Sequence, residues 1–495
     1  MRGPLEEVLL RSSQREKFAS YLLVTCAICF LAAGPLRSQA FSEDWPKYKR
    51  DLANDGLSAE TGINSTNISQ LQTKWTFPTG AIVSASPAIA TVNGTSTLYL
   101  GSWTGTFYAI NAVTGQSIWT FQVDAVGACA KGGCHIGSSA AVDVANNLVF
   151  FGARNAYLYA LNATTGQLVW KQMTGLSAKG YEIWSSPAFF NGMLFVGVSA
   201  HGDDPCLEGG EVNAYQELSG TPVWSFNTID QSTCPSGVCV GGSVWSSVAI
   251  DDVNGIVYAG TGNPGSTCAP PSQNAGLYPD SILAFNAASG TLLNYFQAIK
   301  NDTDDKDFGS SPILHMAKEN NECTKTITTT YWVTAASKNG HVFTLQRDEN
   351  GLTGMVYDNA TPGLGFIGTP SIRTEWKSTA CAAGKNIIDH FNYIDLPNSQ
   401  GVYWQLMQTG LGDTTISDKV ILSPGQAFYS APAVIEDIVI FGGNDGNLHV
   451  LGNHGHQLAT FPIGSNIYSG IAISNGRIYF GAVNGNIYCM SINGH

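Results

Sequence analysis

The stretch Ala109–Trp119 reads Ala-Ile-Asn-Ala-Val-Thr-Gly-Gln-Ser-Ile-Trp, and near-copies of it follow at Ala160–Trp170 and Ala214–Trp224. In each copy a glycine precedes the final tryptophan by four residues. Similarity that returns about every 50 residues is typical of solenoids and propellers. The local pattern is a strand, a turn that needs glycine, and a second strand carrying a large aromatic side chain. One such sheet cannot bury both faces alone, whereas sheets stacked around an axis can. We therefore predict an all-β propeller.

The composition agrees with a compact β protein that has many turns. The chain has 495 residues, of which 55 are glycine, and only 12% are charged. These values differ from those of disordered chains, which are rich in charge. The net charge of −13, without a basic run after the N-terminus, argues against nucleic acid or anionic membranes as partners.

The N-terminus has the features of a secretory signal peptide. Arg2, Arg11 and Arg15 precede an apolar run at about 21–34, and the small residues of 38–40 follow it. The run is short for a membrane span, so we predict a cleaved signal at 1–40, and the alternative is an uncleaved anchor. The mature chain, 41–495, would then be a single propeller without an integral membrane span. It would be secreted, or periplasmic in a bacterium.

Cysteines and glycosylation motifs fit the same route. Of eleven cysteines, two lie in the predicted signal, and the odd number that remains leaves at least one thiol unpaired or intermolecular. The pairs Cys129/Cys134 and Cys234/Cys239 are close together in Gly-rich segments, which predicts loop disulfides in an oxidising compartment. Asn-X-Ser/Thr motifs of the kind found in glycoproteins begin at Asn64, Asn67, Asn93, Asn162, Asn301 and Asn359.

Eight similar units can be marked along the chain. Their approximate bounds are 86–119, 137–170, 184–224, 245–295, 308–357, 366–406, 429–461 and 468–495. Units three and four carry insertions at 199–210 and 262–279, and Asn-Gly or Asp-Gly pairs mark hairpins in the later units. We expect the early strand at Trp75–Phe77 to complete the last blade. The predicted fold is an eight-bladed β-propeller, and seven blades is the alternative if unit six is only a loop.

The repeat Ala-X-Asn-Ala-X-Thr-Gly-Gln-X-X-Trp resembles the tryptophan-docking repeat of quinoprotein dehydrogenases. These enzymes are eight-bladed propellers that hold pyrroloquinoline quinone (PQQ) on their axis. The insertions and the Trp-Ser-Ser stretches look most like the polyvinyl-alcohol-dehydrogenase-like branch. The resemblance implies PQQ-dependent oxidation of a small or polymeric alcohol, with Ca²⁺ as a Lewis acid and an unspecified electron acceptor.

Two motifs of unit four match the family's site. Trp245, in Gly-Ser-Val-Trp-Ser-Ser, matches the tryptophan on which the quinone ring lies, and indole offers the largest π-face for such a platform. The alternative is a core tryptophan, as Trp184 in a similar Trp-Ser-Ser setting shows. Asn263, in Gly-Thr-Gly-Asn-Pro, matches a cofactor-site asparagine that supplies a side-chain oxygen to calcium. The alternative is an asparagine that serves only a turn.

Two further motifs belong to unit five. Asp307, followed by Phe308 and Gly309, matches the family's general base, which takes the alcohol proton and lies at the metal. The alternative is a solvated acidic loop. Lys338, at the start of the hairpin Lys-Asn-Gly-His, matches the cation that bonds the quinone oxygen and stabilises developing charge. The alternative is an exposed hairpin lysine. The resemblance thus implies that Asp307 and Lys338 are catalytic, that Trp245, Asn263 and Lys338 bind cofactor, and that Asn263 and Asp307 bind calcium.

The chain departs from the family pattern in three places. At the end of the unit-three strand, where the family has a calcium-ligating Glu, it has His201 or Gly202. The substitutes that the sequence offers nearby are Asp203, Asp204, Glu208 and Glu211. The family's adjacent Cys-Cys pair is missing, and Cys206 is a candidate remnant. No clear Arg for the quinone carboxylates stands in unit two, where Arg154 and Lys131 are candidates by location.

Two other interpretations compete with a quinone enzyme. Cys129-Ala-Lys-Gly-Gly-Cys134-His135 looks like a haem attachment motif, but it has four residues between the cysteines where that motif has two. We therefore favour a loop disulfide there. The departures listed above also suit a non-catalytic extracellular propeller that binds or scaffolds other molecules after losing the quinone site.

Overall fold

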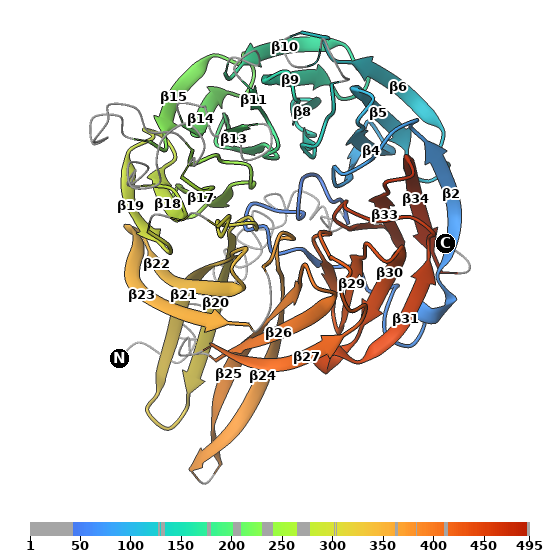
Figure 1. The fold of residues 1–495 in the computed structure, drawn as a ribbon. Coiled ribbons are helices and arrows are strands. Elements are labelled where there is room, and N and C mark those ends of the chain that lie inside the picture. Colours follow the sequence, from blue (N-terminus) through green and yellow to red (C-terminus); the bar gives the residue numbers. More distant parts are fainter. Residues whose placement is uncertain are drawn as a thin grey trace, which may run out of the picture. The chain divides into compact units, whose positions relative to one another are not determined.

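The computed structural model describes residues 43–126, 129, 134–175, 180–200, 209–229, 241–264, 278–300, 302, 304–361, 365–382, 384–409 and 414–492. The predicted signal at 1–40 and the pair Cys234/Cys239 lie outside these residues. Residues 43–495 form one compact unit. Its strands form eight blades around a central axis (Figure 1), of which the fifth and sixth share one eight-stranded sheet, so the eight-bladed propeller is confirmed and the seven-bladed alternative is wrong.

The first four blades are antiparallel sheets with four strands each, except the third, which has five. Blade 1 consists of β3 (Ala88–Val92), β4 (Thr95–Gly101), β5 (Thr106–Asn111) and β6 (Ser117–Gln122). Blade 2 consists of β7 (Ala141–Asp143), β8 (Leu148–Gly152), β9 (Tyr157–Asn162) and β10 (Leu168–Met173). Blade 3 consists of β12 (Ala188–Phe190), β13 (Met193–Ala200), β14 (Glu211–Gln216) and β15 (Pro222–Asn227), with β11 (Tyr181–Glu182) added to β13. Blade 4 consists of β16 (Ala249–Asp251), β17 (Ile256–Gly260), β18 (Ser281–Asn286) and β19 (Leu292–Gln297).

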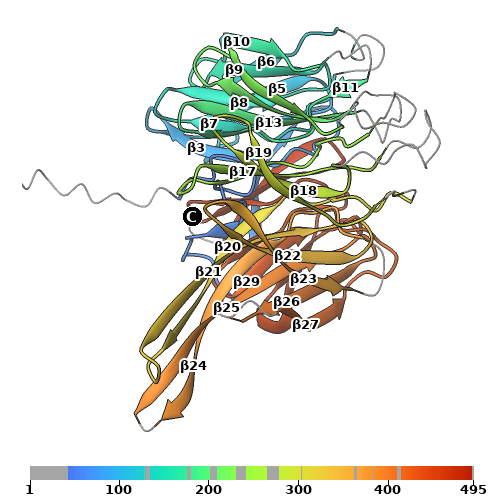
Figure 2. The same ribbon diagram turned by 90° about the vertical axis from the view of Figure 1, so that its left-hand side faces the viewer.

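Blades 5 and 6 have longer strands. Blade 5 consists of β20 (Ile313–Asn321), β21 (Thr326–Ala336), β22 (His341–Asp348) and β23 (Gly351–Ala360). Blade 6 consists of β24 (Ser371–Ala382), β25 (Lys385–Pro397), β26 (Val402–Gln408) and β27 (Thr414–Ile421), so its last strand lies beyond the predicted end of unit six at 406. Their first hairpins extend away from the ring (Figure 2) and are joined by β20–β25 pairing and by a Cys323–Cys381 disulfide, which we did not predict.

The last two blades close the ring. Blade 7 consists of β28 (Ala433–Ile435), β29 (Ile438–Gly442), β30 (Asn447–Leu451) and β31 (Gln457–Pro462), with β1 (Leu57–Ser58) parallel to β28. Blade 8 consists of β32 (Ala472–Ser474), β33 (Arg477–Gly481), β34 (Asn486–Ser491) and the early strand β2 (Gln72–Pro78). The pairing of β2 with β34 is the closure we expected from Trp75–Phe77. The remaining elements are the 3-10 turns η1 (Ile68–Gln70) and η6 (Asn453–Gly455). No helix in the described part of the chain is long and apolar enough to cross a membrane.

The tryptophan of each repeat docks on the glycine of the next blade. Gly166 has φ +73°, and a Cβ built on it would lie 2.6 Å from the Trp119 ring. The Trp119 indole N–H donates to the Ala163 carbonyl in the same turn (3.0 Å). Equivalent contacts join Trp75 to Gly115, Trp170 to Gly220 and Trp224 to Gly290. The repeated Gly and Trp are therefore the two halves of one contact between neighbouring blades.

A chain of hydrogen bonds around the axis also links the blades. In each link a backbone N–H just before the first strand of one blade donates to a hydroxyl of a neighbouring blade, at 2.8–3.0 Å. The hydroxyls that accept belong to Ser139, Ser186, Ser247, Ser311, Thr369 and Ser86. In each Trp-Ser-Ser stretch the second serine, Ser186 or Ser247, therefore belongs to this chain of hydrogen bonds.

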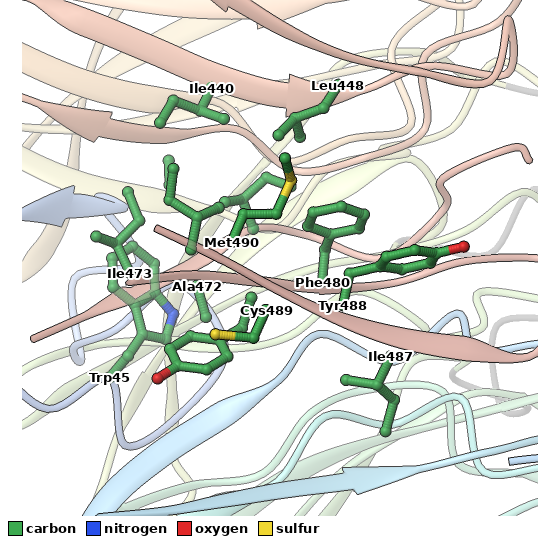
Figure 3. Close-up of a cluster of buried hydrophobic side chains, with 14 of the residues drawn as sticks. Trp45, Ile440, Leu448, Ala472, Ile473, Phe480, Ile487, Tyr488, Cys489 and Met490 are labelled. Atoms are coloured by element: carbon green, nitrogen blue, oxygen red, sulfur yellow. The ribbon is translucent and has the colours of Figure 1, made fainter. Parts of the chain in front are cut away.

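The segment Trp45–Gly56, which we call the inner loop, connects the first strands of most blades and is drawn in blue inside the ring of Figure 1. Its carbonyls accept from the N–H groups of Ile89, Val142, Ile250, Leu314, Ile372 and Val434. Trp45 is fully buried and belongs to the same hydrophobic cluster as Ile473 and Cys489 of blade 8 (Figure 3). The inner loop therefore stabilises the ring by contacts that no single blade could make.

We expect the inner loop to make stability depend on pH through Lys49. Its buried Nζ donates to Ser371 and to the Pro432 carbonyl, and burial lowers the pKa of Lys49 to about 7. Between pH 7 and the ordinary lysine pKa, the unfolded chain binds a proton that the native protein does not. The free energy of unfolding should therefore rise with pH across this range. Lys49→Met should lose that part of the rise in denaturant titrations from pH 6 to 10, whereas Lys74→Met, at an exposed lysine, should keep it. Parallel pH curves for the Lys49 variant and the unmodified protein would contradict this.

Candidate functional site

A cavity of about 470 Å³ lies at the inner ends of the blades. Every blade contributes to its wall through the segment just before its first strand, which places the cavity on the propeller axis. Its aromatic lining consists of Trp103, Trp184, Trp245, Tyr429, Tyr468 and, from the inner loop, Tyr48. Such a cavity has the size and the aromatic walls that suit a flat organic ligand.

The four predicted site residues come from one corner of the ring, in blades 4 and 5. Trp245 precedes β16 and Asn263 follows β17, while Asp307 precedes β20 and Lys338 follows β21. Strands β16 and β17 are antiparallel, as are β20 and β21, so these positions lie at the same end of each hairpin. The sequence thus directs all four side chains to one end of two adjacent sheets.

Asp307 is the centre of the cluster and its side chain is 1% exposed. Its Oδ1 lies 2.9 Å from the Lys338 Nζ, and its Oδ2 accepts from the Trp245 indole N–H at 3.1 Å. The Lys338 ammonium also lies 5.1 Å from the centroid of the Trp245 ring. The indole, the carboxylate and the ammonium therefore touch one another at the edge of the axial cavity.

Asn263 joins the cluster through Asp305, a residue that we did not single out. The Asn263 Nδ2 donates to Asp305 Oδ1 (3.1 Å), and Lys338 Nζ donates to the same oxygen (2.6 Å). This leaves the Asn263 Oδ1 buried and without a hydrogen-bond partner among the described residues. Asp305 lies in the acidic run beside Asp307, but its sequence position gave no reason to choose it over Asp304.

Burial shifts the acid–base properties of the cluster. It raises the pKa of Asp307 to about 6, although the Lys338 ammonium and the Trp245 N–H favour the ionised carboxylate. Burial also lowers the pKa of Lys338, but the Asp307 and Asp305 carboxylates outweigh it, so that pKa lies above its usual value. A carboxylate whose pKa is near neutrality suits a general base.

A second buried carboxylate, Asp280, lies beside the cluster and was missed in the sequence. Its side chain is 1% exposed, and neither oxygen has a hydrogen-bond partner among the described residues. Burial, followed by the charges of Asp302 and Asp307, raises the pKa of Asp280 to about 9. Asp280 follows the unit-four insertion in a segment without a recognisable motif, so only strand pairing shows its place.

The other predicted candidates lie elsewhere or outside the described residues. Arg154 does not stand alone, because its Nε lies 3.8 Å from the buried Glu182, which also accepts the Trp184 indole N–H (2.5 Å). Glu211 accepts from Asn213 in its own strand (2.9 Å). Lys131, Cys206, Glu208 and residues 201–204 lie outside the described part. Cys129 and Cys134 form the expected disulfide, and Cys489 is a free buried thiol.

The described residues offer the type of oxygen ligand that a hard cation prefers, but too few of them to complete its coordination. Within the described ranges, no group of three or more His, Cys, Asp or Glu side chains has an arrangement that could hold a metal. Among the described residues of this corner, the Asn263 Oδ1 and both Asp280 oxygens have no hydrogen-bond partner, and the Asp307 Oδ1 has only the Lys338 ion pair. Ca²⁺ prefers neutral and anionic oxygens of this kind and completes its coordination with water or ligand oxygens.

Comparison with solved structures agrees with the fold. The quinohemoprotein alcohol dehydrogenase of Comamonas testosteroni superposes with a TM-score of 0.70 at 19% identity, over 94% of this chain and 82% of that one. The protein BamB of Moraxella catarrhalis superposes with a TM-score of 0.55 at 14% identity, over 85% of this chain and 99% of that one. At these identities the likeness concerns architecture alone.

Comparison of sequences is more specific. The chain is 26% identical to the quinoprotein alcohol dehydrogenase PedH of Pseudomonas putida over 68% of this chain and 60% of that protein. It is 24% identical to a polyvinylalcohol dehydrogenase of a Pseudomonas species over 62% of this chain and 50% of that protein. The chain thus spans less than two thirds of these relatives. The model of the PQQ glucose/ethanol/alcohol dehydrogenase β-propeller domain matches residues 45–355, well over half of the chain. The chain therefore belongs to the PQQ-dependent alcohol dehydrogenase family of β-propellers.

Proposed function

We propose that this protein is an oxidoreductase that uses PQQ to oxidise a small or polymeric alcohol. The observation that carries the proposal is the contact of Asp307 and Lys338 with Trp245, which lines the axial cavity, because three side chains matched separately to the family's motifs meet there. Membership of the family supports the same chemistry. The disulfides fit a secreted or periplasmic location.

The side chains have distinct roles in this proposal. The Trp245 indole would supply a flat surface for the quinone, and Lys338, whose ammonium lies over the same ring, would stabilise negative charge that develops on a quinone oxygen. Asp307 takes the hydroxyl proton of the alcohol at its carboxylate, whose orientation the Trp245 N–H and Lys338 hold. When bound, PQQ accepts the hydride from the alcohol carbon, which is the redox step that the protein itself cannot supply.

Calcium is the second proposed cofactor. Asn263 would hold it through Oδ1, since Asp305 engages the other end of the amide. Asp307 would be a second ligand, as the family motif implies. The ion would add Lewis acidity next to the quinone site, which is the usual contribution of a cation at a developing oxyanion.

Reconstitution tests this function. Purified protein incubated with PQQ and Ca²⁺ should bind the quinone and should reduce an artificial dye when primary alcohols or polyvinyl alcohol are added. Protein with Ca²⁺ but without PQQ, and protein with PQQ and a chelator, are the controls. Quinone binding measured by absorbance is read separately from dye reduction. Absence of both would reject the enzyme in favour of a non-catalytic binding or scaffold propeller.

A further inference from the structure

We propose that Asp280 supplies the carboxylate of a cation site at Asn263, in place of the Glu that the third unit lacks. The inference rests on the proposed calcium site but concerns a residue that the family motifs do not indicate. The unit-three strand end carries His201 and Gly202 where a carboxylate is expected. A cation in this corner therefore needs a carboxylate from another element.

Strand pairing places the Asp280 backbone opposite Gly262, one residue before Asn263. The β17–β18 register pairs Gly260 with Ile282, and it continues beyond the strands. The Thr261 N–H donates to the Ser281 carbonyl (2.9 Å), and the Asp280 N–H donates to the Gly262 carbonyl (3.0 Å). Asp280 thus lies opposite Gly262, the residue directly before Asn263. Directly opposite residues of antiparallel strands have Cβ atoms within about 5.5 Å of each other, so the Asp280 side chain lies on the face of Gly262, which faces Asp307.

Gly262 itself lies close to Asp307 of the candidate site. A Cβ built on Gly262 would lie 3.2 Å from Asp307 Oδ2 and 3.1 Å from the Ser243 carbonyl oxygen. The backbone at Gly262 therefore lies directly against the Asp307 carboxylate. The charges that act on Asp280 are those of Asp302, Asp307, Lys338 and Asp305, which are the charges of this same corner.

Several buried oxygens at this corner of the ring lack hydrogen-bond partners among the described residues. Both Asp280 oxygens and the Asn263 Oδ1 are buried and have no hydrogen-bond partner among the described residues. A buried carboxylate without a donor is costly to keep, because desolvation is not compensated. The single ammonium nearby, that of Lys338, is already bonded to Asp305 and Asp307. A divalent cation coordinated by Asp280 and Asn263 would satisfy all three oxygens.

Calcium is the species that this donor set fits. The two residues offer carboxylate and amide oxygens and no sulfur or imidazole, which selects hard cations. An anionic ligand also raises affinity, because ligand charge is one of the factors that tune Ca²⁺ dissociation constants. The remaining coordination positions are open to Asp307, to water and to an oxygen of a bound ligand.

The test uses full-length protein without quinone. Chelator-treated protein is titrated with Ca²⁺ by calorimetry, and its Tm is recorded with and without Ca²⁺. We expect binding and a raised Tm in the unmodified protein. Asp280→Asn should weaken binding by about 30-fold or more and should remove the Tm shift, since the lost charge is a ligand. Asp304→Asn, which removes an exposed carboxylate from the neighbouring acidic run at 302–307, should bind Ca²⁺ as the unmodified protein does.

Several results would overturn the proposal. One is unchanged Ca²⁺ affinity in Asp280→Asn, which would mean that Asp280 is not a ligand of the ion. Another is the absence of Ca²⁺ binding by the unmodified protein. Should Asp280→Asn fail to fold, Asn263→Ala decides, because unchanged affinity there rejects the site. Ca²⁺ binding that depends on Asp280 without PQQ turnover would reject the proposed function alone, and turnover with unaffected Asp280→Asn binding would reject this inference alone.

Discussion

Replacing Asp307 with Asn should lower kcat by a factor of about 10²–10⁴ while the quinone still binds. The asparagine side chain keeps the volume of the carboxylate and can still accept from the Trp245 indole N–H through its carbonyl oxygen. It cannot take a proton from an alcohol, and it leaves Lys338 with one carboxylate partner, Asp305, in place of two. The measurement is dye reduction under saturating alcohol, with bound PQQ quantified by its absorbance in the same sample.

The matched control for this variant is Asp304→Asn. Asp304 belongs to the same acidic segment, pairs with Lys306 and has a 63% exposed side chain. Its replacement removes the same charge from the segment without touching Trp245 or Lys338, so turnover should stay near that of the unmodified protein. Turnover of Asp307→Asn within a factor of about ten of the unmodified protein, with PQQ bound, would remove Asp307 from the mechanism.

The largest loss of stability is expected from Gly166→Ala. Alanine at φ +73° costs about 1–2 kcal/mol, and its Cβ would lie 2.6 Å from the Trp119 ring. Overpacking of this kind adds about 1–3 kcal/mol, because the ring is held by its hydrogen bond to Ala163 and cannot move freely. The free energy of unfolding in denaturant should therefore fall by about 2–5 kcal/mol.

Gly94→Ala separates the two contributions. Gly94 has a similar φ of +77°, but a Cβ there would meet nothing within 4 Å. Its replacement should cost the backbone contribution alone, about 1–2 kcal/mol. Equal losses in the two variants would show that contact between the glycine and the neighbouring tryptophan does not hold the blades together.

Local patterns were sufficient to predict the architecture, and they supplied the candidate residues of the site. The Gly-X-X-X-Trp repeat predicts the propeller because the same short contact recurs between neighbouring blades, as in Trp119 with Gly166. Trp245, Asn263, Asp307 and Lys338 were predicted because each lies in a contiguous motif at the end of a strand. Such motifs can be recognised without knowledge of the rest of the fold, because the hairpin itself sets the direction of the side chains at the end of a strand.

Contacts between distant segments could not be predicted in this way. The Cys323–Cys381 disulfide depends on two hairpins that lie side by side only because β20 pairs with β25. Asp305 differs from Asp304 because it contacts the Lys338 ammonium, and Lys338 belongs to a different hairpin. The sequence of the inner loop is that of an ordinary turn-rich segment. Its hydrogen bonds to the first strands of most blades form only when the ring is closed.

The amino-acid pattern thus sufficed for the repeat, the number of blades and the family, because each depends on residues close together in the chain. Folding in three dimensions was needed to find the partners of the site residues, among them Asp305, which accepts hydrogen bonds from Asn263 and Lys338. The physical reason is burial: a carboxylate acquires its charge state, its missing hydrogen bonds and its neighbours from whatever the ring brings around it, and no local sequence encodes that environment.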